Sequence, residues 1–285
     1  MLPTPDTSHV PYERVYEPAE DSFLLLDTLS SAGETAFLRS RFGGSAPASS
    51  PARVPLVLEV GCGSGVVVAF VNAHAGALFG TPDVLAAAVD LNPHACRATR
   101  ETVRRAAAAA AADASSAPCS SSSSPGGSGT FLGAARADLA SPFRDRCVDV
   151  LVFNPPYVPT PSLPSPPAPG APGPSSFDDD AYLLALSYAG GRDGMETTER
   201  LLAALPRALA PRGCAYVLLC AQNRPDAVKA RARALGPRWR ADTVATSGKR
   251  AGWERLQVVR IWTDEERGPD GGGEAEAEAE AVPAG

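Results

Sequence analysis

The stretch LEVGCGSGVVVAF, residues 58–70, decides the fold. A short apolar run ends at three alternate glycines, Gly61, Gly63 and Gly65, and a second apolar run of helical length follows them. Glycine allows a tight backbone turn and a close approach of a ligand to the start of a helix. We therefore expect a buried strand, a ligand-binding turn and a helix, although such a turn alone also fits a purely structural corner.

An acidic residue at this turn narrows the class of ligand. Glu59 lies just before the first glycine. Dinucleotide-binding proteins hold an anionic pyrophosphate at the equivalent turn, where a carboxylate would repel it. The sequence therefore favours a cationic or neutral nucleoside.

Apolar runs of strand and helix length alternate along the rest of the chain. Such alternation forms parallel βαβ units, so we expect an α/β fold with a doubly wound, mostly parallel sheet of seven strands. The expected strands are residues 54–60, 84–90, 130–136, 148–153, 215–220, 242–245 and 256–262. The expected helices are residues 64–73, 93–112, 196–209 and 225–235.

Two segments interrupt this pattern within one expected domain, residues 1–265. Residues 114–129 are rich in Ser, Gly and Pro, and residues 160–176 are rich in Pro. Both are typical of disordered loops, here inserted between strands that need each other. Residues 266–285 form an acidic, low-complexity tail.

Composition excludes several functional classes. Lys and Arg number 26 against 32 Asp and Glu, which argues against a non-specific nucleic-acid binder. The six cysteines form no C-x-x-C pair, so we expect reduced thiols and no metal site. The N-terminus lacks the apolar segment of a signal peptide, and no apolar run is long enough to span a membrane. We expect a protein of the cytoplasm or nucleus.

Two aspartates follow expected strands. Asp90 ends the strand of residues 84–90, where an acid can accept hydrogen bonds from both ribose hydroxyls. A helix cap is the alternative for Asp90, although Asn92 suits that role better. Asp138 lies just beyond the next strand and fits a contact to a base edge or a simple turn equally well.

The corner Asn154-Pro155-Pro156-Tyr157 ends the strand of residues 148–153. The carboxyl ends of strands border the ligand crevice in doubly wound folds. The Asn154 side-chain oxygen can accept one N–H of a planar NH₂ group. The Pro155 carbonyl can accept the second, since Pro156 has no N–H, while Tyr157 can lie against the flat face of the substrate.

Together, the E-V-G-x-G-x-G turn and N-P-P-Y resemble the S-adenosylmethionine-dependent amino methyltransferases, which modify adenine, cytosine or glutamine nitrogens. VYEPAEDSFLLLD (residues 15–27) and YAGGRDG (residues 188–194) narrow the resemblance to the HemK-like family. The similarity is to its eukaryotic and archaeal branch, which methylates the GGQ glutamine of class I peptide release factors. The match covers about residues 12–263 apart from the two inserts, and it implies a Rossmann-like class I methyltransferase fold with an antiparallel last strand.

The resemblance also implies roles for individual residues. Glu59 and Gly61 would line the methionine part of S-adenosylmethionine, Asp90 would hold its ribose, and Gly63 would also bind the cofactor. The remaining expected cofactor residues are Asp138 and Leu139 at the adenine, Ser22 above the cofactor, and Asn154 between donor and acceptor. Asn154, Pro155 and Tyr157 would be the catalytic residues, acting by positioning the acceptor nitrogen.

Three other functions remain open. The N-P-P-Y motif can hold the NH₂ group of adenine equally well, so a nucleic-acid adenine methyltransferase is one alternative. Protein lysine methylation is a second, although an ammonium group is not planar and must first lose a proton. A scaffold that keeps the fold without the activity is the third.

The resemblance also implies a protein partner. The strand Thr130–Arg136 would lie at one edge of the sheet, carrying Phe131 and Leu132 and little charge to protect it. A small zinc-binding activator subunit, which several eukaryotic methyltransferases share, would pair with this edge by β-augmentation. The expected assembly is a heterodimer, with a class I release factor as its protein substrate.

Overall fold

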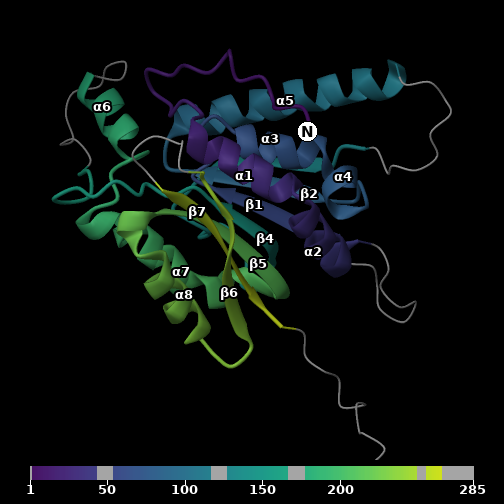
Figure 1. The fold of residues 1–285 in the computed structure, drawn as a ribbon. Helices are drawn as coiled ribbons and strands as arrows, with labels where there is room; N and C mark the ends of the chain where they lie inside the picture. The colour runs from purple at the N-terminus through teal and green to yellow at the C-terminus, as the bar shows by residue number, and fades with distance from the viewer. Residues whose placement is uncertain (1, 44–53, 117–126, 166–176, 249–254, 265–285) are drawn as a thin grey trace, which may run out of the picture.

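The computed structural model describes residues 2–43, 54–116, 127–165, 177–248 and 255–264 (Figure 1). Its strands are β1 (Leu56–Val60), β2 (Leu85–Asp90), β3 (Thr130–Arg136), β4 (Val148–Phe153), β5 (Leu209–Cys220), β6 (Trp239–Thr246) and β7 (Leu256–Thr263). Its α-helices are α1 (Glu20–Ser30), α2 (Ala32–Phe42), α3 (Val66–Ala73), α4 (Ala75–Phe79), α5 (Pro93–Ser116), α6 (Phe177–Ala185), α7 (Glu196–Ala208) and α8 (Pro225–Arg233). None of these helices is long and apolar enough to cross a membrane.

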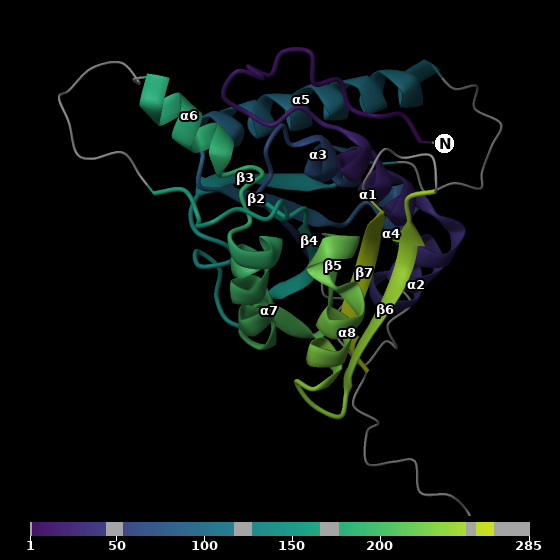
Figure 2. The same cartoon turned by 60° about the vertical axis from the view of Figure 1, so that its left-hand side comes forward.

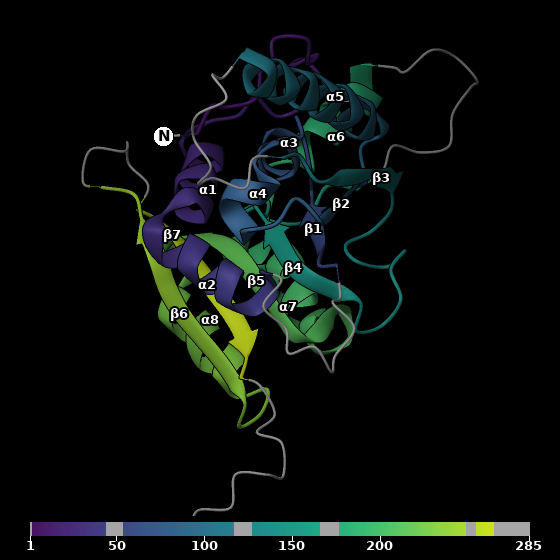
Figure 3. The same cartoon turned by 90° about the vertical axis from the view of Figure 1, so that its right-hand side faces the viewer.

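All seven strands form one sheet in the order β3-β2-β1-β4-β5-β7-β6. Neighbours from β3 to β5 are parallel, whereas β7 is antiparallel to both β5 and β6. The expected doubly wound, mostly parallel sheet with an antiparallel last strand is therefore confirmed. Strands β3 and β6 lie at opposite ends of the sheet (Figure 3).

Helices cover both faces of the sheet because the strands are apolar on both faces. Alternate residues of β5 enter different cores: Tyr216 and Leu218 pack beneath α1 and α3, whereas Val217 and Leu219 pack against α7 and α8. Figure 2 shows α7 and α8 on the side of the sheet opposite α3 and α5. The chain order reverses at the β1–β4 pair, and at such a reversal a crevice opens at the carboxyl ends of the strands.

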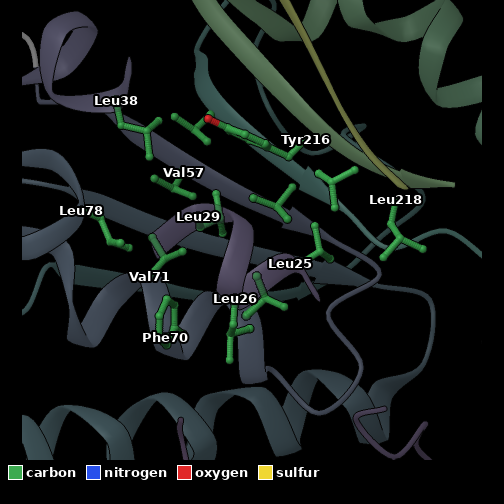
Figure 4. Close-up of a cluster of buried hydrophobic side chains, with 14 of the residues drawn as sticks. Leu25, Leu26, Leu29, Leu38, Val57, Phe70, Val71, Leu78, Tyr216 and Leu218 are labelled. Atoms are coloured by element: carbon green, nitrogen blue, oxygen red, sulfur yellow. The ribbon is translucent and has the colours of Figure 1, made fainter. Parts of the chain in front are cut away.

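Helices α1 and α2 were not predicted from the sequence, but they close one face of the core. Leu25, Leu26 and Leu29 of α1 pack into the same core as Phe70 of α3 and Val57 of β1, as Figure 4 shows. In α2, Glu34 is buried and accepts hydrogen bonds from Tyr216 Oη at 2.6 Å and from Arg260 at 2.7 Å. This polar cluster fixes α2 against β5 and β7.

The two ends of the first predicted insert, residues 114–129, are part of the folded domain. Helix α5 continues to Ser116, beyond the expected end at residue 112. At the other end, the Gly129 N–H donates to the Asn72 carbonyl at 2.7 Å, so residues 127–129 are joined to the domain. The prediction of disorder for residues 117–126 and 166–176 lies outside the described residues, as does the tail from residue 265.

The buried Glu34–Arg260 pair yields a test of the fold. Replacing Glu34 with Ala leaves the Arg260 guanidinium buried without its carboxylate, which should lower the free energy of unfolding by about 3 kcal/mol. Urea denaturation measures this change. The control is Glu101→Ala, which breaks exposed ion pairs on α5 and should hardly alter stability. Equal effects of the two variants would contradict this account.

Candidate functional site

A cavity of about 530 Å³ opens at the carboxyl ends of β1, β2 and β4. Every site residue predicted from the sequence lines it, and their individual roles remain predictions. These residues are Ser22, Glu59, Gly61, Gly63, Asp90, Asp138, Leu139, Asn154, Pro155 and Tyr157. The fold therefore brings together residues that lie between positions 22 and 157 of the sequence.

The glycine turn forms one wall because its backbone is left-handed. Gly61, Gly63 and Gly65 have φ angles of 66°, 50° and 78°. At Gly65 a Cβ atom would lie 2.6 Å from the Thr99 Cα atom of α5, so only glycine fits. The turn can therefore pack against α5 while its backbone faces the cavity.

Glu59 lies beneath this turn and caps the first turn of α3. Its side chain is buried, and its Oε2 atom accepts the Val68 N–H at 2.9 Å. Burial, with a smaller contribution from the nearby Asp90 carboxylate, raises the pKa of Glu59 to about 8. At neutral pH the Glu59 carboxyl group is therefore protonated.

Asp90 is held by two backbone N–H groups. Its Oδ2 atom accepts the Gly63 N–H at 2.9 Å, and its Oδ1 atom accepts the Asn92 N–H at 2.8 Å. The Asn92 side chain caps α5 by accepting the His94 N–H at 2.8 Å. The alternative that Asp90 serves as the helix cap is therefore wrong. Burial raises the Asp90 pKa.

Acidic residues outnumber basic ones among the described lining residues of the cavity. Asp21, Glu59, Asp90 and Asp138 line it, and Arg200 of α7 is the only Lys or Arg among its described lining residues. Arg200 forms an ion pair with Asp138. This balance of charge favours a cationic ligand.

Asn154 presents an unsatisfied acceptor at the corner after β4. Its Nδ2 atom donates to the Asp21 Oδ2 atom at 3.0 Å. Its Oδ1 atom is buried and has no hydrogen-bond partner in the structure. Because leaving a buried acceptor unpaired costs free energy, this atom is suited to accept an N–H from a ligand.

Backbone contacts with the segment 188–194 hold the Asn154–Tyr157 corner in place. Val158 donates its N–H to the Tyr188 carbonyl at 3.0 Å, and Gly190 donates to the Val158 carbonyl at 2.8 Å. A Cβ atom at Gly190 would collide with the Pro156 carbonyl, and one at Gly194 would collide with the Tyr157 carbonyl. Both glycines are needed because two stretches of backbone meet here.

Sequence reasoning missed several residues of this site. Asp21, in the N-terminal segment, accepts a hydrogen bond from Asn154 and another from Tyr16, and only the neighbouring Ser22 was predicted. Their signal was present in VYEPAEDSF, where an acid precedes Ser22. Asn223 gave no signal, yet its Nδ2 atom donates to the Tyr157 and Asp193 carbonyls at 3.2 Å.

The raised pKa of Glu59 predicts a pH dependence of stability. Between the ordinary value of 4.5 and about 8, the folded protein keeps a proton that the unfolded chain releases. The free energy of unfolding should therefore fall as pH rises through this window, by up to about 1.4 kcal/mol per pH unit. Glu59→Gln keeps an acceptor for Val68 and removes this contribution. Urea denaturation of both unliganded proteins at pH 6 and pH 8 measures it, and parallel pH profiles would contradict the assignment.

Comparisons with known proteins place the chain in a family. No family model matches. Methyltransferase HEMK2 of Mus musculus is 33% identical over 266 residues, covering 91% of this chain and 96% of the relative. The Schizosaccharomyces pombe eRF1 methyltransferase catalytic subunit mtq2 is 29% identical over 265 residues, covering 92% and 96%.

A solved structure, the hMettl16 catalytic domain in complex with MAT2A 3'UTR hairpin 1, aligns at 14% identity with a TM-score of 0.49. It covers 90% of this chain and 74% of that chain, and it is too distant to inform function. The similarity to HEMK2 extends over nearly the full length of both proteins. The chain belongs to the HEMK2 family of methyltransferases.

Proposed function

We propose that this chain transfers a methyl group from S-adenosylmethionine to the side-chain nitrogen of the GGQ glutamine in a class I peptide release factor. The observation that carries the proposal is the buried, unpaired Oδ1 atom of Asn154. The names of two relatives support this choice of substrate. One is the eRF1 methyltransferase catalytic subunit, and the other is a putative protein N5-glutamine methyltransferase of Methanocaldococcus jannaschii, 25% identical over 255 residues.

The cavity fits S-adenosylmethionine in volume and in charge. Its volume of about 530 Å³ lies within the usual range for small-molecule sites. The predominance of acidic over basic lining residues suits the sulfonium cation. When bound, the cofactor supplies the activated methyl group on its sulfur. Glu59, Asp90 and Asp138 would hold its methionine, ribose and adenine parts.

Asp90 is suited to the ribose although both its oxygens already have donors. Each carboxylate oxygen has a second lone pair, so each can also accept from a ribose hydroxyl. The backbone N–H groups of Gly63 and Asn92 meanwhile fix the carboxylate plane. Asp138 is less available to the adenine than Asp90 is to the ribose, because it already forms an ion pair with Arg200. The Asp138 carboxylate would have to bind Arg200 and the adenine amine together.

Positioning of the acceptor NH₂ group is the main catalytic contribution of this chain. The Asn154 Oδ1 atom accepts one N–H, and the Pro155 carbonyl accepts the other. An amide nitrogen is a poor nucleophile, so holding its lone pair toward the methyl group is worth several kcal/mol. The same two acceptors stabilise positive charge that develops on the nitrogen.

Adenine in nucleic acid is the second candidate substrate, since its NH₂ group has the same planar geometry. Among the charged residues in the described lining of the cavity, all but Arg200 are acidic, which disfavours a phosphate backbone at its mouth. Lysine fits less well, because two fixed acceptors match a planar NH₂ group better than an ammonium group.

Two substitutions test this assignment of roles. Asn154→Ala should abolish methylation of a release factor by labelled S-adenosylmethionine while largely preserving cofactor affinity, because the acceptor NH₂ loses its partner. Asp90→Ala should instead weaken cofactor binding by roughly 1.5–3 kcal/mol, the value of a charge-assisted hydrogen bond. Calorimetry measures affinity. A release factor lacking the GGQ glutamine, a histone and DNA serve as comparison acceptors, and label on DNA alone would contradict the proposal.

The activator partner is the second part of the proposal. β3 is an edge strand, and among the described residues no strand pairs with its outer side. The pairing with β2 shifts between Phe131 and Gly133, which leaves the bulged Leu132 58% exposed. Phe131 packs against the cluster of α3 and α5. The accessible apolar contact for a small zinc-binding subunit is therefore Leu132.

Leu132→Lys should weaken the heterodimer with the activator and leave cofactor affinity unchanged, because a charge would be buried at the paired edge. Co-expression of both chains followed by gel filtration measures assembly. Leu235→Lys, at an exposed leucine after α8, is the matched control. A wild-type chain that is soluble, fully active and elutes alone in the presence of the activator would disprove this partner.

A further inference from the structure

The Asp21 carboxylate lies at the centre of a hydrogen-bond network beside Asn154. Its Oδ1 atom accepts the Ser22 N–H at 2.6 Å and the Ser22 hydroxyl at 3.2 Å. Its Oδ2 atom accepts the Tyr16 hydroxyl at 3.2 Å and the Asn154 Nδ2–H at 3.0 Å. The side chain is only 3% exposed, so no bulk water replaces these donors.

This network determines which end of the Asn154 amide faces the cavity. A carboxylate accepts hydrogen bonds and donates none. The NH₂ end of Asn154 must therefore face Asp21, and the oxygen must face the other way. The reversed amide would place two acceptor oxygens about 3 Å apart and turn an NH₂ group toward the NH₂ group of the substrate. In the observed orientation, Oδ1 is the unpaired atom.

The position of Asp21 is itself rigid. It lies in the first turn of α1, whose leucines Leu25, Leu26 and Leu29 are buried in the core. Figure 4 shows these leucines packed between helix and sheet. Asp21 and Asn154 are 133 positions apart in the sequence, so packing of α1 is what brings them together.

We propose that Asp21 is a positioning residue, which orients the Asn154 amide so that its oxygen receives the acceptor nitrogen; this role rests on the methyl transfer proposed above. It acts through Asn154 and does not touch the substrate. Tyr16 and Ser22 support it by filling the remaining lone pairs of the carboxylate.

Asparagine cannot replace Asp21 in this role. The Ser22 N–H requires an acceptor, so the oxygen of an asparagine at position 21 is drawn to it, and the NH₂ group then faces Asn154. Asn154 must reverse to accept that hydrogen bond, which turns its own NH₂ group into the cavity. Asp21→Asn should therefore lower kcat by at least about tenfold, as expected for a misplaced reacting group, with cofactor Kd changed less than about threefold.

Exchanging the two side chains provides the decisive test. In Asn154→Asp alone, two carboxylates face each other and the site is impaired. In the double variant Asp21→Asn/Asn154→Asp, the new amide donates to one oxygen of the new carboxylate, and the other oxygen faces the cavity as an acceptor. We expect the double variant to exceed the kcat of each single variant by at least about fivefold, a non-additivity that a purely structural role does not produce.

Nuclear magnetic resonance gives a readout independent of activity. The Asn154 side-chain NH₂ signal is assigned by its loss in Asn154→Asp. Its exchange with solvent should be slow in the wild type, where it donates to buried Asp21, and faster in Asp21→Asn. The control Asp27→Asn lies on the exposed side of the same helix and should change neither kcat nor exchange.

Distinct outcomes overturn the two proposals. Asp21→Asn with kcat within twofold of the wild type, or a double variant no faster than the single ones, overturns the role of Asp21. Absence of label on the release factor in the wild type overturns the proposed substrate. The same variants are then compared on whichever of DNA or histone takes label, and the role of Asp21 is judged on those rates.

Discussion

The parallel pairing of β1 with β4 is the constraint on which the rest of the structure depends. Val57 to Val60 align with Val150 to Phe153, and the order of the chain reverses at this pair. Helices leave these two strands on opposite faces of the sheet, α3 on one and α7 on the other, so the carboxyl ends are not covered. The glycine turn after β1 and the Asn-Pro-Pro-Tyr corner after β4 consequently face each other across one cavity.

Rigidity at the corner after β4 comes from backbone contacts. The two prolines remove N–H donors, and the carbonyl groups beyond them approach Gly190 and Gly194 too closely for any side chain. Asn223 binds three carbonyl oxygens, those of Tyr157, Asp193 and Gly194, from a third direction. A corner held in this way can present its acceptors to a substrate with little loss of entropy on binding.

Electrostatics in the cavity favour a ligand that brings positive charge. Glu59 is protonated at neutral pH because burial and the proximity of Asp90 disfavour its ionised form. A cationic ligand would reverse this preference, since an opposite charge nearby stabilises the carboxylate. Loss of the positive charge on transfer of a methyl group would weaken the attraction, which suits release of the product.

The sequence by itself determined the strands, the helices after them and most of the site. The reason is that these signals are local. The glycines of residues 61–65 and the prolines of residues 154–157 each predict a turn from local backbone chemistry. The alternating apolar runs place both turns at the ends of strands. All ten predicted site residues therefore line one cavity. Helices α1 and α2 were missed because their apolar residues, seen apart from the core, do not form a distinct stripe.

Only the tertiary structure decided what those residues contact. The pairing of Asp21 with Asn154, of Arg200 with Asp138 and of Glu34 with Arg260 joins positions far apart in the chain. Hydrogen bonds and pKa shifts act over a few ångströms, and no local pattern records which distant side chain arrives within that range. The sequence could therefore name Asn154 as the acceptor of a substrate NH₂ group. Which end of the Asn154 amide pairs with Asp21, and which end is left without a partner, was decided by the packing of α1.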